Sequence, residues 1–175
     1  MTILLPDTLD EVLHPVFETL PFERAMKALV VTDQTPFPEA SARVAEAVAS
    51  PALADRPDLV AGIWLYVDEL DKAHAACQDL ATPTGAYWHA IVHRREGDFS
   101  NAHYWFKRAV HHPAMGLIDL TGGGAGSGTA VAAYDPDETI DRVARAHERG
   151  DASNPALTSV QHKEWKALFG WCVQQ

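Results

Sequence analysis

The sequence predicts an all-α protein, and three observations support this prediction. Apolar residues recur at helical spacing in most of the segments that lie between prolines and glycines. Prolines or capping residues stand where many of these segments begin. No segment shows the sustained alternation of β-branched and polar residues that is typical of strands. We therefore expect helices joined by short turns, and no sheet.

The first third of the chain is predicted to form short helices that prolines separate. One is expected from Asp7 to Leu20 and a second from Phe22 to Val31. A third, rich in alanine, should begin at Pro38 and end near Pro51. Residues 31–38 lie between the second and third helices and are expected to form a connecting loop.

The strongest helical signals lie between Asp58 and Pro113. Residues 58–80 hold apolar residues at helical spacing and are expected to divide into two helices near residues 67–69. Residues 85–97 predict a further helix, and residues 99–112 predict another with Asp98 as its N-cap.

The chain after Pro113 changes in composition. Residues 121–134 are rich in glycine and predict a flexible connection, followed by C-terminal helices over residues 135–175. Asp135 as cap and Pro136 at the first helical position mark the start of a helix that Gly150 should end. A final helix from Pro155 is expected to bury an apolar stripe made of Trp165, Leu168, Phe169 and Cys172.

Length and composition limit the classes of function. The chain has 175 residues and a formal net charge of -10, which suits a single domain, residues 1–175, with its own core. A chain this acidic gains little from counterion release, which argues against a nucleic-acid partner. No apolar run approaches the roughly 18 residues of a membrane-spanning helix, and no secretory signal is recognisable. With cysteines only at 77 and 172, a disulfide framework is improbable, and we expect a cytoplasmic protein without a membrane partner.

Residues 58–113 contain an internal repeat. Ala73-His74 aligns with Ala102-His103, 29 residues later, and Ala61 then aligns with Ala90 without a gap. The second unit has a small residue, an aromatic and another small residue at Ala102, Phe106 and Ala109, with Pro113 after them. This pattern resembles the tetratricopeptide and related helical-hairpin repeats. The resemblance implies two helical hairpins capped by flanking helices, and it implies no ligand. Residues 87–108 also resemble a group of uncharacterised helical proteins, which implies no activity.

The repeat draws attention to two histidines. Where the first unit has Val60 and Trp64 facing the partner helix, the second has His89 and His93. Because a helix advances by ~100° per residue, His89, His93 and Glu96 lie on one face. Two histidines four residues apart on one helical face are the geometry by which imidazoles bind a metal.

A divalent metal would need a third ligand from another helix. His74 is the one we assign, and His103, Asp68 or Glu69 are alternatives. A zincin motif is excluded because Ala90 follows His89 where the motif requires glutamate. The histidines could instead be core residues with hydrogen-bond partners, or could act in acid-base chemistry without a metal.

A second group of residues is cationic. Residues 85–113 contain four basic residues against two acidic ones, together with five of the nine histidines. Guanidinium groups bind carboxylates or phosphates and aromatic rings supply stacking area, so this cluster predicts a pocket for a small anionic ligand or an acidic peptide terminus. The predicted lining is Tyr87, His89, His93, Arg94, Arg95, Asn101, Tyr104 and Arg108.

In this hypothesis the arginines bind the anion, while Asn101 and Tyr104 orient it. Tyr87, Ile91 and Arg94 are expected on the face of their helix opposite the histidines, toward the concave side of the hairpins. The alternative is that Arg95 and Arg108 form structural ion pairs with acids such as Asp68, Glu69 or Asp98, and that the aromatic residues are core.

Three functional hypotheses follow. The first is a soluble helical binding module with the pocket just described. The second is a metal-dependent or histidine-based enzyme, with His89, His93 and Glu96 as candidate catalytic residues. The third is a scaffold that binds a protein partner.

Overall fold

The structure is a computed structural model that describes residues 3–32, 36–109, 111–120 and 133–175. These residues form helices and no strand, which confirms the predicted all-α class. The α-helices are α1 (Asp7–Thr19), α2 (Pro38–Val48), α3 (Pro57–Tyr66), α4 (Leu70–Cys77), α5 (Pro83–Glu96), α6 (Phe99–Ala109), α7 (Pro136–Glu148) and α8 (Pro155–Val173). Two short 3₁₀ helices, η1 (Pro51–Leu53) and η2 (Pro113–Leu117), lie between them.

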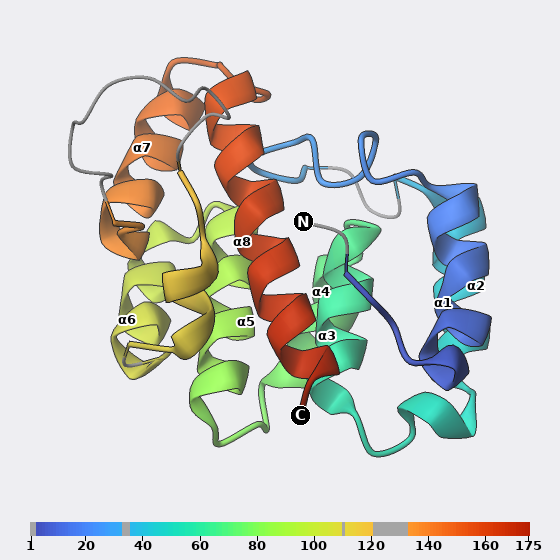
Figure 1. The fold of residues 1–175 in the computed structure, drawn as a ribbon. Coiled ribbons are helices and arrows are strands. Elements are labelled where there is room, and N and C mark those ends of the chain that lie inside the picture. The colour runs from blue at the N-terminus through green and yellow to red at the C-terminus, as the bar shows by residue number, and fades with distance from the viewer. Residues whose placement is uncertain (1–2, 33–35, 110, 121–132) are drawn as a thin grey trace, which may run out of the picture.

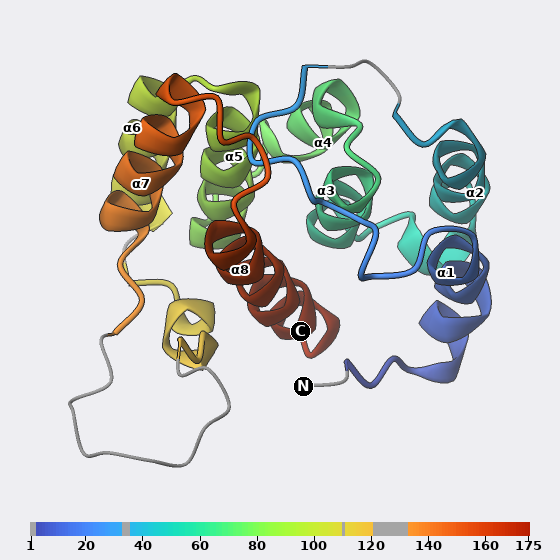
Figure 2. The same ribbon diagram turned by 90° about the horizontal axis from the view of Figure 1, so that it is seen from above.

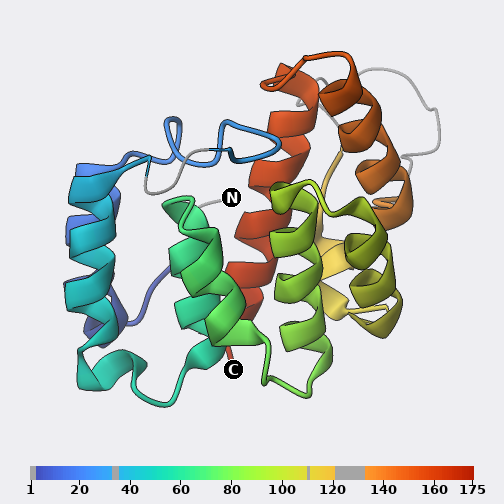
Figure 3. The same ribbon diagram turned by 180° about the vertical axis from the view of Figure 1, so that it is seen from behind.

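Helices α3 to α6 form two consecutive helical hairpins. Helix α3 packs on α4, α5 packs on α6, and α4 packs on α5, so that the four helices stand in a row (Figure 3). The first hairpin turns at residues 67–69, where the sequence predicted the division. The second turns at Gly97, whose left-handed backbone (φ 84°) ends α5, and Asp98 caps α6 by accepting a bond from the Asn101 amide.

Helix α8 fills the inner face of these hairpins. Its predicted apolar stripe is fully buried, and the Trp165 indole donates a hydrogen bond to the Gly62 carbonyl of α3. A side chain at Gly62 would place Cβ 2.7 Å from Phe169 of α8, so glycine is needed for this close approach. Figures 1 and 2 show α8 lying across the row, with α6 and α7 on one side and α1 and α2 on the other. The concave side implied by the repeat is therefore occupied by the chain itself.

The prediction of a helix from Phe22 to Val31 is wrong. This segment forms turns, with Met26 in the left-handed region at φ 51°. Side chains of α8 bind its carbonyl groups: Gln161 donates to the Met26 carbonyl, and the His162 ring nitrogen lies 2.8 Å from the Ala25 oxygen. These distant partners satisfy backbone groups that would otherwise need a helix.

The ends of the C-terminal helices agree with the sequence. Asp135 caps α7 by accepting bonds from the amides of Asp137 and Glu138, and Gly150 follows the helix at φ 72°. Residues 121–132 of the predicted flexible connection lie outside the described residues. No helix in the described part of the chain is both long and apolar enough to cross a membrane.

Candidate functional site

Three histidines from two helices meet on the side of α5 that faces away from α8. His74 belongs to α4, whereas His89 and His93 lie one turn apart on α5, and one ring nitrogen from each lies within 4.8 Å of the others. The Nε2 atoms of His74 and His89 are 2.8 Å apart. The rings of His89 and His93 stack with centroids 4.7 Å apart. We call these three residues the histidine cluster.

A tight connection between α4 and α5 produces this arrangement. The Thr82 side chain caps α5 by accepting a bond from the Gly85 amide. A Cβ atom at Gly85 would lie 2.3 Å from both Cβ and the carbonyl oxygen of Leu80, so the chain can turn this closely only with glycine. Helix α4 is thereby held against α5, with His74 opposite His89.

His89 lies buried in the cluster, and Nδ1 of both His89 and His93 lacks a hydrogen-bond partner among the described residues. His89 is 5% exposed, and Trp105 of α6 stacks on its ring with centroids 4.1 Å apart. Burial, followed by the charges of His74 and His93, lowers the pKa of His89 to about 4, so this ring is neutral at pH 7. Its Nδ1 atom is buried and has no hydrogen-bond partner among the described residues.

Glu96 lies at the edge of the cluster. Its Oε2 atom is 2.9 Å from Nδ1 of His93, and the two side chains are 30% and 13% exposed respectively. The predicted shared face of His89, His93 and Glu96 is therefore present. Glu96 touches the outer side of His93, and its carboxylate is not part of the convergent set of nitrogens.

The spacing of the nitrogens suits a transition-metal ion. Zinc binds imidazole nitrogen at about 2 Å, which places two ligands of a tetrahedral site about 3.3 Å apart. The His74–His89 pair, at 2.8 Å, would open by about half an ångström, and the widest pair would close. Shifts of this size need only small side-chain rotations.

Two predicted anion-binding residues are instead structural, which corrects the sequence analysis. Arg94 is completely buried and forms a two-pronged ion pair with Glu164 of α8, with Nη1 3.1 Å from Oε1. The Tyr134 hydroxyl donates to the same carboxylate. Arg95 is also completely buried and pairs with Asp68 at 2.6 Å, as the alternative reading had it. Neither guanidinium group is available to an anion, because each already binds a carboxylate inside the protein.

The other predicted pocket residues do not converge. Tyr87 is buried and packs on Phe106 with ring centroids 5.1 Å apart. Asn101 bonds to Asp98 at 2.6 Å on the surface. Tyr104 is exposed, and the Arg108 guanidinium lies 5.6 Å from its ring centroid. The eight residues therefore do not line one pocket.

The alternative metal ligands are also placed elsewhere. His103 turns toward α7, with Nδ1 2.5 Å from Asp137 and Nε2 3.2 Å from Asp141. Glu69 accepts a bond from Ser41 and pairs with Lys72. Of the candidates for a third ligand, His74 is thus the one that lies with His89 and His93.

Two functional-looking groups escaped the sequence analysis. Glu164 interrupts the apolar face of α8, and a buried acid of this kind is a signal that a buried base lies opposite. Tyr134 joins the same buried pair, and no local pattern pointed to it.

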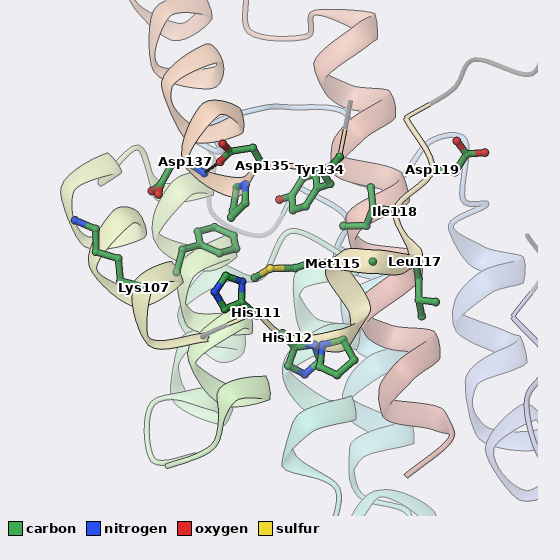
Figure 4. Close-up of a pocket in the computed structure, with 15 residues that line it drawn as sticks. Lys107, His111, His112, Met115, Leu117, Ile118, Asp119, Tyr134, Asp135 and Asp137 are labelled. Atoms are coloured by element: carbon green, nitrogen blue, oxygen red, sulfur yellow. Dashed lines mark hydrogen bonds between the residues drawn. The ribbon is translucent and has the colours of Figure 1, made fainter. Parts of the chain in front are cut away.

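A cleft of about 1010 Å³ lies apart from the histidine cluster, between the end of α6, η2 and the start of α7. Figure 4 shows His111, Met115 and Tyr134 lining it. Several of its polar groups are already bound: His112 lies 3.0 Å from the Thr84 hydroxyl, and Asp137 pairs with His103. None of the predicted site residues lines this cleft.

Comparison with protein-family models, with curated proteins and with solved structures found no match for the chain. Its function is therefore inferred from the geometry of its side chains.

Proposed function

We propose that the protein binds a divalent transition-metal ion through His74, His89 and His93, and that this ion is the centre of its activity. The observation that carries the proposal is the convergence of three ring nitrogens from two helices within 4.8 Å. Imidazole nitrogen favours zinc, copper, nickel and cobalt, whereas magnesium and calcium prefer oxygen. Zinc is the first ion to test, because it imposes no geometric preference of its own.

The number of ligands favours a catalytic role over a structural one. Structural zinc sites have four protein ligands, whereas catalytic sites have three and keep a position for water or substrate. The described residues bring together three ligands of this kind. A bound zinc ion would lower the pKa of a coordinated water to about 7 and so supply a nucleophile for hydrolysis or hydration. A small anion could also bind the ion as its fourth ligand. The anionic ligand predicted from the sequence is therefore still proposed, but bound to the metal and not to the arginines.

Burial of the cluster supports the same proposal. Buried polar atoms in folded proteins nearly always have a hydrogen-bond partner. Nδ1 of His89 and Nδ1 of His93 have none within the described ranges, as is also true of Nε in the structural residue Arg94. Two such atoms in one cluster of three histidines support the proposal without carrying it.

We also propose that α3 to α6 are a tetratricopeptide-like pair of hairpins. The aligned alanines support this: Ala61 and Ala90 are both buried, as are Ala73 and Ala102. A peptide partner on the concave side is not part of the proposal, because α8 lies there.

The second candidate function is acid-base chemistry without a metal. The contact between Nε2 of His74 and Nε2 of His89 favours it, because at 2.8 Å one nitrogen donates a proton that the other accepts. Such a pair can exchange a proton with a bound molecule.

Metal analysis of untagged protein separates the two candidates. We expect about one zinc ion per chain, a fall in melting temperature in chelator, and loss of zinc in His74→Ala and His93→Ala. His14→Ala is the matched control, because His14 lies exposed on α1 and pairs with Glu18. Protein without metal, and with the same melting temperature in chelator, would overturn the metal proposal and favour the acid-base pair. If His74→Ala then leaves every activity intact, a protein partner is the hypothesis that is left.

A further inference from the structure

We infer that Glu96 is a positioning residue that holds His93 in the orientation and tautomer required of a metal ligand. This inference rests on the proposed function of the histidine cluster. It assigns Glu96 a place outside the ligand set, in contact with one ligand, which differs from a role as fourth ligand or as general base.

The contact between Glu96 and His93 has the distance this role requires. Oε2 of Glu96 lies 2.9 Å from Nδ1 of His93, and a rotation of either side chain is needed to bring the N–H into line with this oxygen. A neutral imidazole has one N–H and one lone pair. When Nδ1–H donates to Glu96, Nε2 of His93 keeps the lone pair with which it can bind an ion. A carboxylate on the far nitrogen of a ligating histidine is the usual way in which proteins fix its ring and raise its basicity.

The end of α5 keeps Glu96 in place. The Asp98 amide donates to the His93 carbonyl at 2.9 Å, and the Gly97 amide donates to the Arg94 carbonyl at 3.2 Å. These two bonds, with Gly97 in the left-handed region, are the pattern that closes a helix firmly. Glu96 is the last residue of α5, and its backbone is therefore fixed one turn from His93.

Partial burial of His93 makes this contact worth more than an ordinary surface pair. The His93 side chain is 13% exposed, whereas the His14–Glu18 pair on α1 is 60% and 69% exposed at a distance of 3.3 Å. Exposed pairs of the second kind contribute little, because water screens them. Nδ1 lacks a hydrogen-bond partner within the described residues in both His89 and His93, but only His93 has a carboxylate within ion-pair distance there, so it is the ligand on α5 that an acid can orient.

The test is a titration with Co²⁺, whose visible absorption reports the number and type of its ligands. We expect Glu96→Gln to weaken Co²⁺ binding by about 10- to 100-fold, and Glu96→Ala to weaken it further because glutamine keeps an oxygen acceptor. The spectrum at saturation should match that of the wild type in both variants. Glu18→Gln, which removes the carboxylate of the exposed pair, should bind Co²⁺ as the wild type does.

Two results would overturn the inference while leaving the metal site intact. One is unchanged affinity in both Glu96 variants. The other is an altered spectrum at saturation, which would make Glu96 a direct ligand. A wild-type protein that binds no Co²⁺ is a different result, because it removes the proposed function and this inference with it.

A measurement on the metal-free wild type gives an independent check. Nitrogen chemical shifts from NMR distinguish the two neutral tautomers of a histidine. At a pH where His93 is neutral, we expect its proton on Nδ1. A proton on Nε2 would contradict the inference whatever the variants do.

Discussion

The two hairpins share a backbone plan and differ in what they bury. At the positions where α3 has Val60 and Trp64, α5 has His89 and His93. Helix α3 packs with apolar residues at these and neighbouring positions, so the hairpin architecture itself has no need of histidine. The difference teaches that the second hairpin has imidazoles where the first has apolar packing, which the proposed metal site would explain.

The two faces of α5 extend this comparison. On the face toward α8, the charge of Arg94 is matched by Glu164 through two hydrogen bonds, which is what a structural role requires. On the opposite face, His89 has a buried nitrogen without a partner among the described residues. Nε of Arg94 also lacks a partner among the described residues, so the two faces differ in the ion pair on the first and the convergent ring nitrogens on the second.

The largest expected effect lies on the structural face. Arg94→Ala leaves the Glu164 carboxylate buried without its partner, and we expect a loss of about 3–5 kcal/mol in the free energy of unfolding. The double variant Arg94→Met with Glu164→Leu should recover much of this loss, since an apolar pair of similar volume needs no partner. Urea denaturation measures both. A loss below about 1 kcal/mol in Arg94→Ala would show that the pair is not structural.

The next effect lies on the histidine face. Zinc at 100 times its dissociation constant should stabilise the wild type by about 2.7 kcal/mol, because the ion binds only the folded state. His74→Ala should abolish this gain, and thermal unfolding with and without zinc measures it. An equal gain in His74→Ala would place the ion elsewhere.

A smaller effect on stability, expected from the histidine face of α5 and not from its structural face, depends on pH. His89 has a folded-state pKa of about 4 against an ordinary value of 6.5, so the unfolded chain binds a proton that the folded chain does not. Stability of the metal-free protein should therefore fall as the pH drops from about 6.5 to 4, by about 1–3 kcal/mol from this residue. Burial also lowers the pKa of His112 and His162, which adds to the fall in the same direction.

His89→Leu should retain the contributions of His112 and His162 and lose that of His89, so its stability should depend less steeply on pH. At pH 7 we expect this variant to be as stable as the wild type within about 1 kcal/mol, since removal of the unpartnered Nδ1 offsets loss of the hydrogen bond to half-buried His74. Denaturation at several pH values measures the slope. An unchanged slope would contradict the low pKa of His89.

The smallest effect is expected at the exposed end of the predicted anion pocket. Arg108 lies over the rings of Tyr104 and Trp105 and makes no ion pair in the part of the chain that the structure describes. Arg108→Gln should change the free energy of unfolding by no more than about 0.5 kcal/mol and leave zinc affinity unchanged. A weaker affinity for zinc would extend the site to this residue.

Most of the fold could be predicted, because its signals are local. Prolines stand at the first position of α2, α5, α7 and α8, and they favour the start of a helix whatever the rest of the chain does. Residues 22–31 could not be predicted in this way. Their carbonyl groups bind Gln161 and His162, and partners more than a hundred residues away leave no local pattern.

For the site, too, the local features could be predicted and the features that depend on distant contacts could not. The spacing of His89 and His93 on one helix predicted their shared face, since four residues make about one turn. The choice of His74 over His103 depended on how the hairpins pack, with α4 beside α5 and α7 beside α6. The arginines were misassigned because Glu164, the partner of Arg94, lies 70 residues later in the chain.

The position of α8 has a consequence for how this architecture can change. A row of hairpins ordinarily offers its concave side to partners and grows by adding units. Here the last helix of the chain closes that side, with Gly62 allowing Phe169 of α8 to pack closely against α3. A new ligand site in this architecture must therefore lie between the helices of the row. The histidine cluster is such a place, because His74 of α4 meets His89 of α5 under Trp105 of α6.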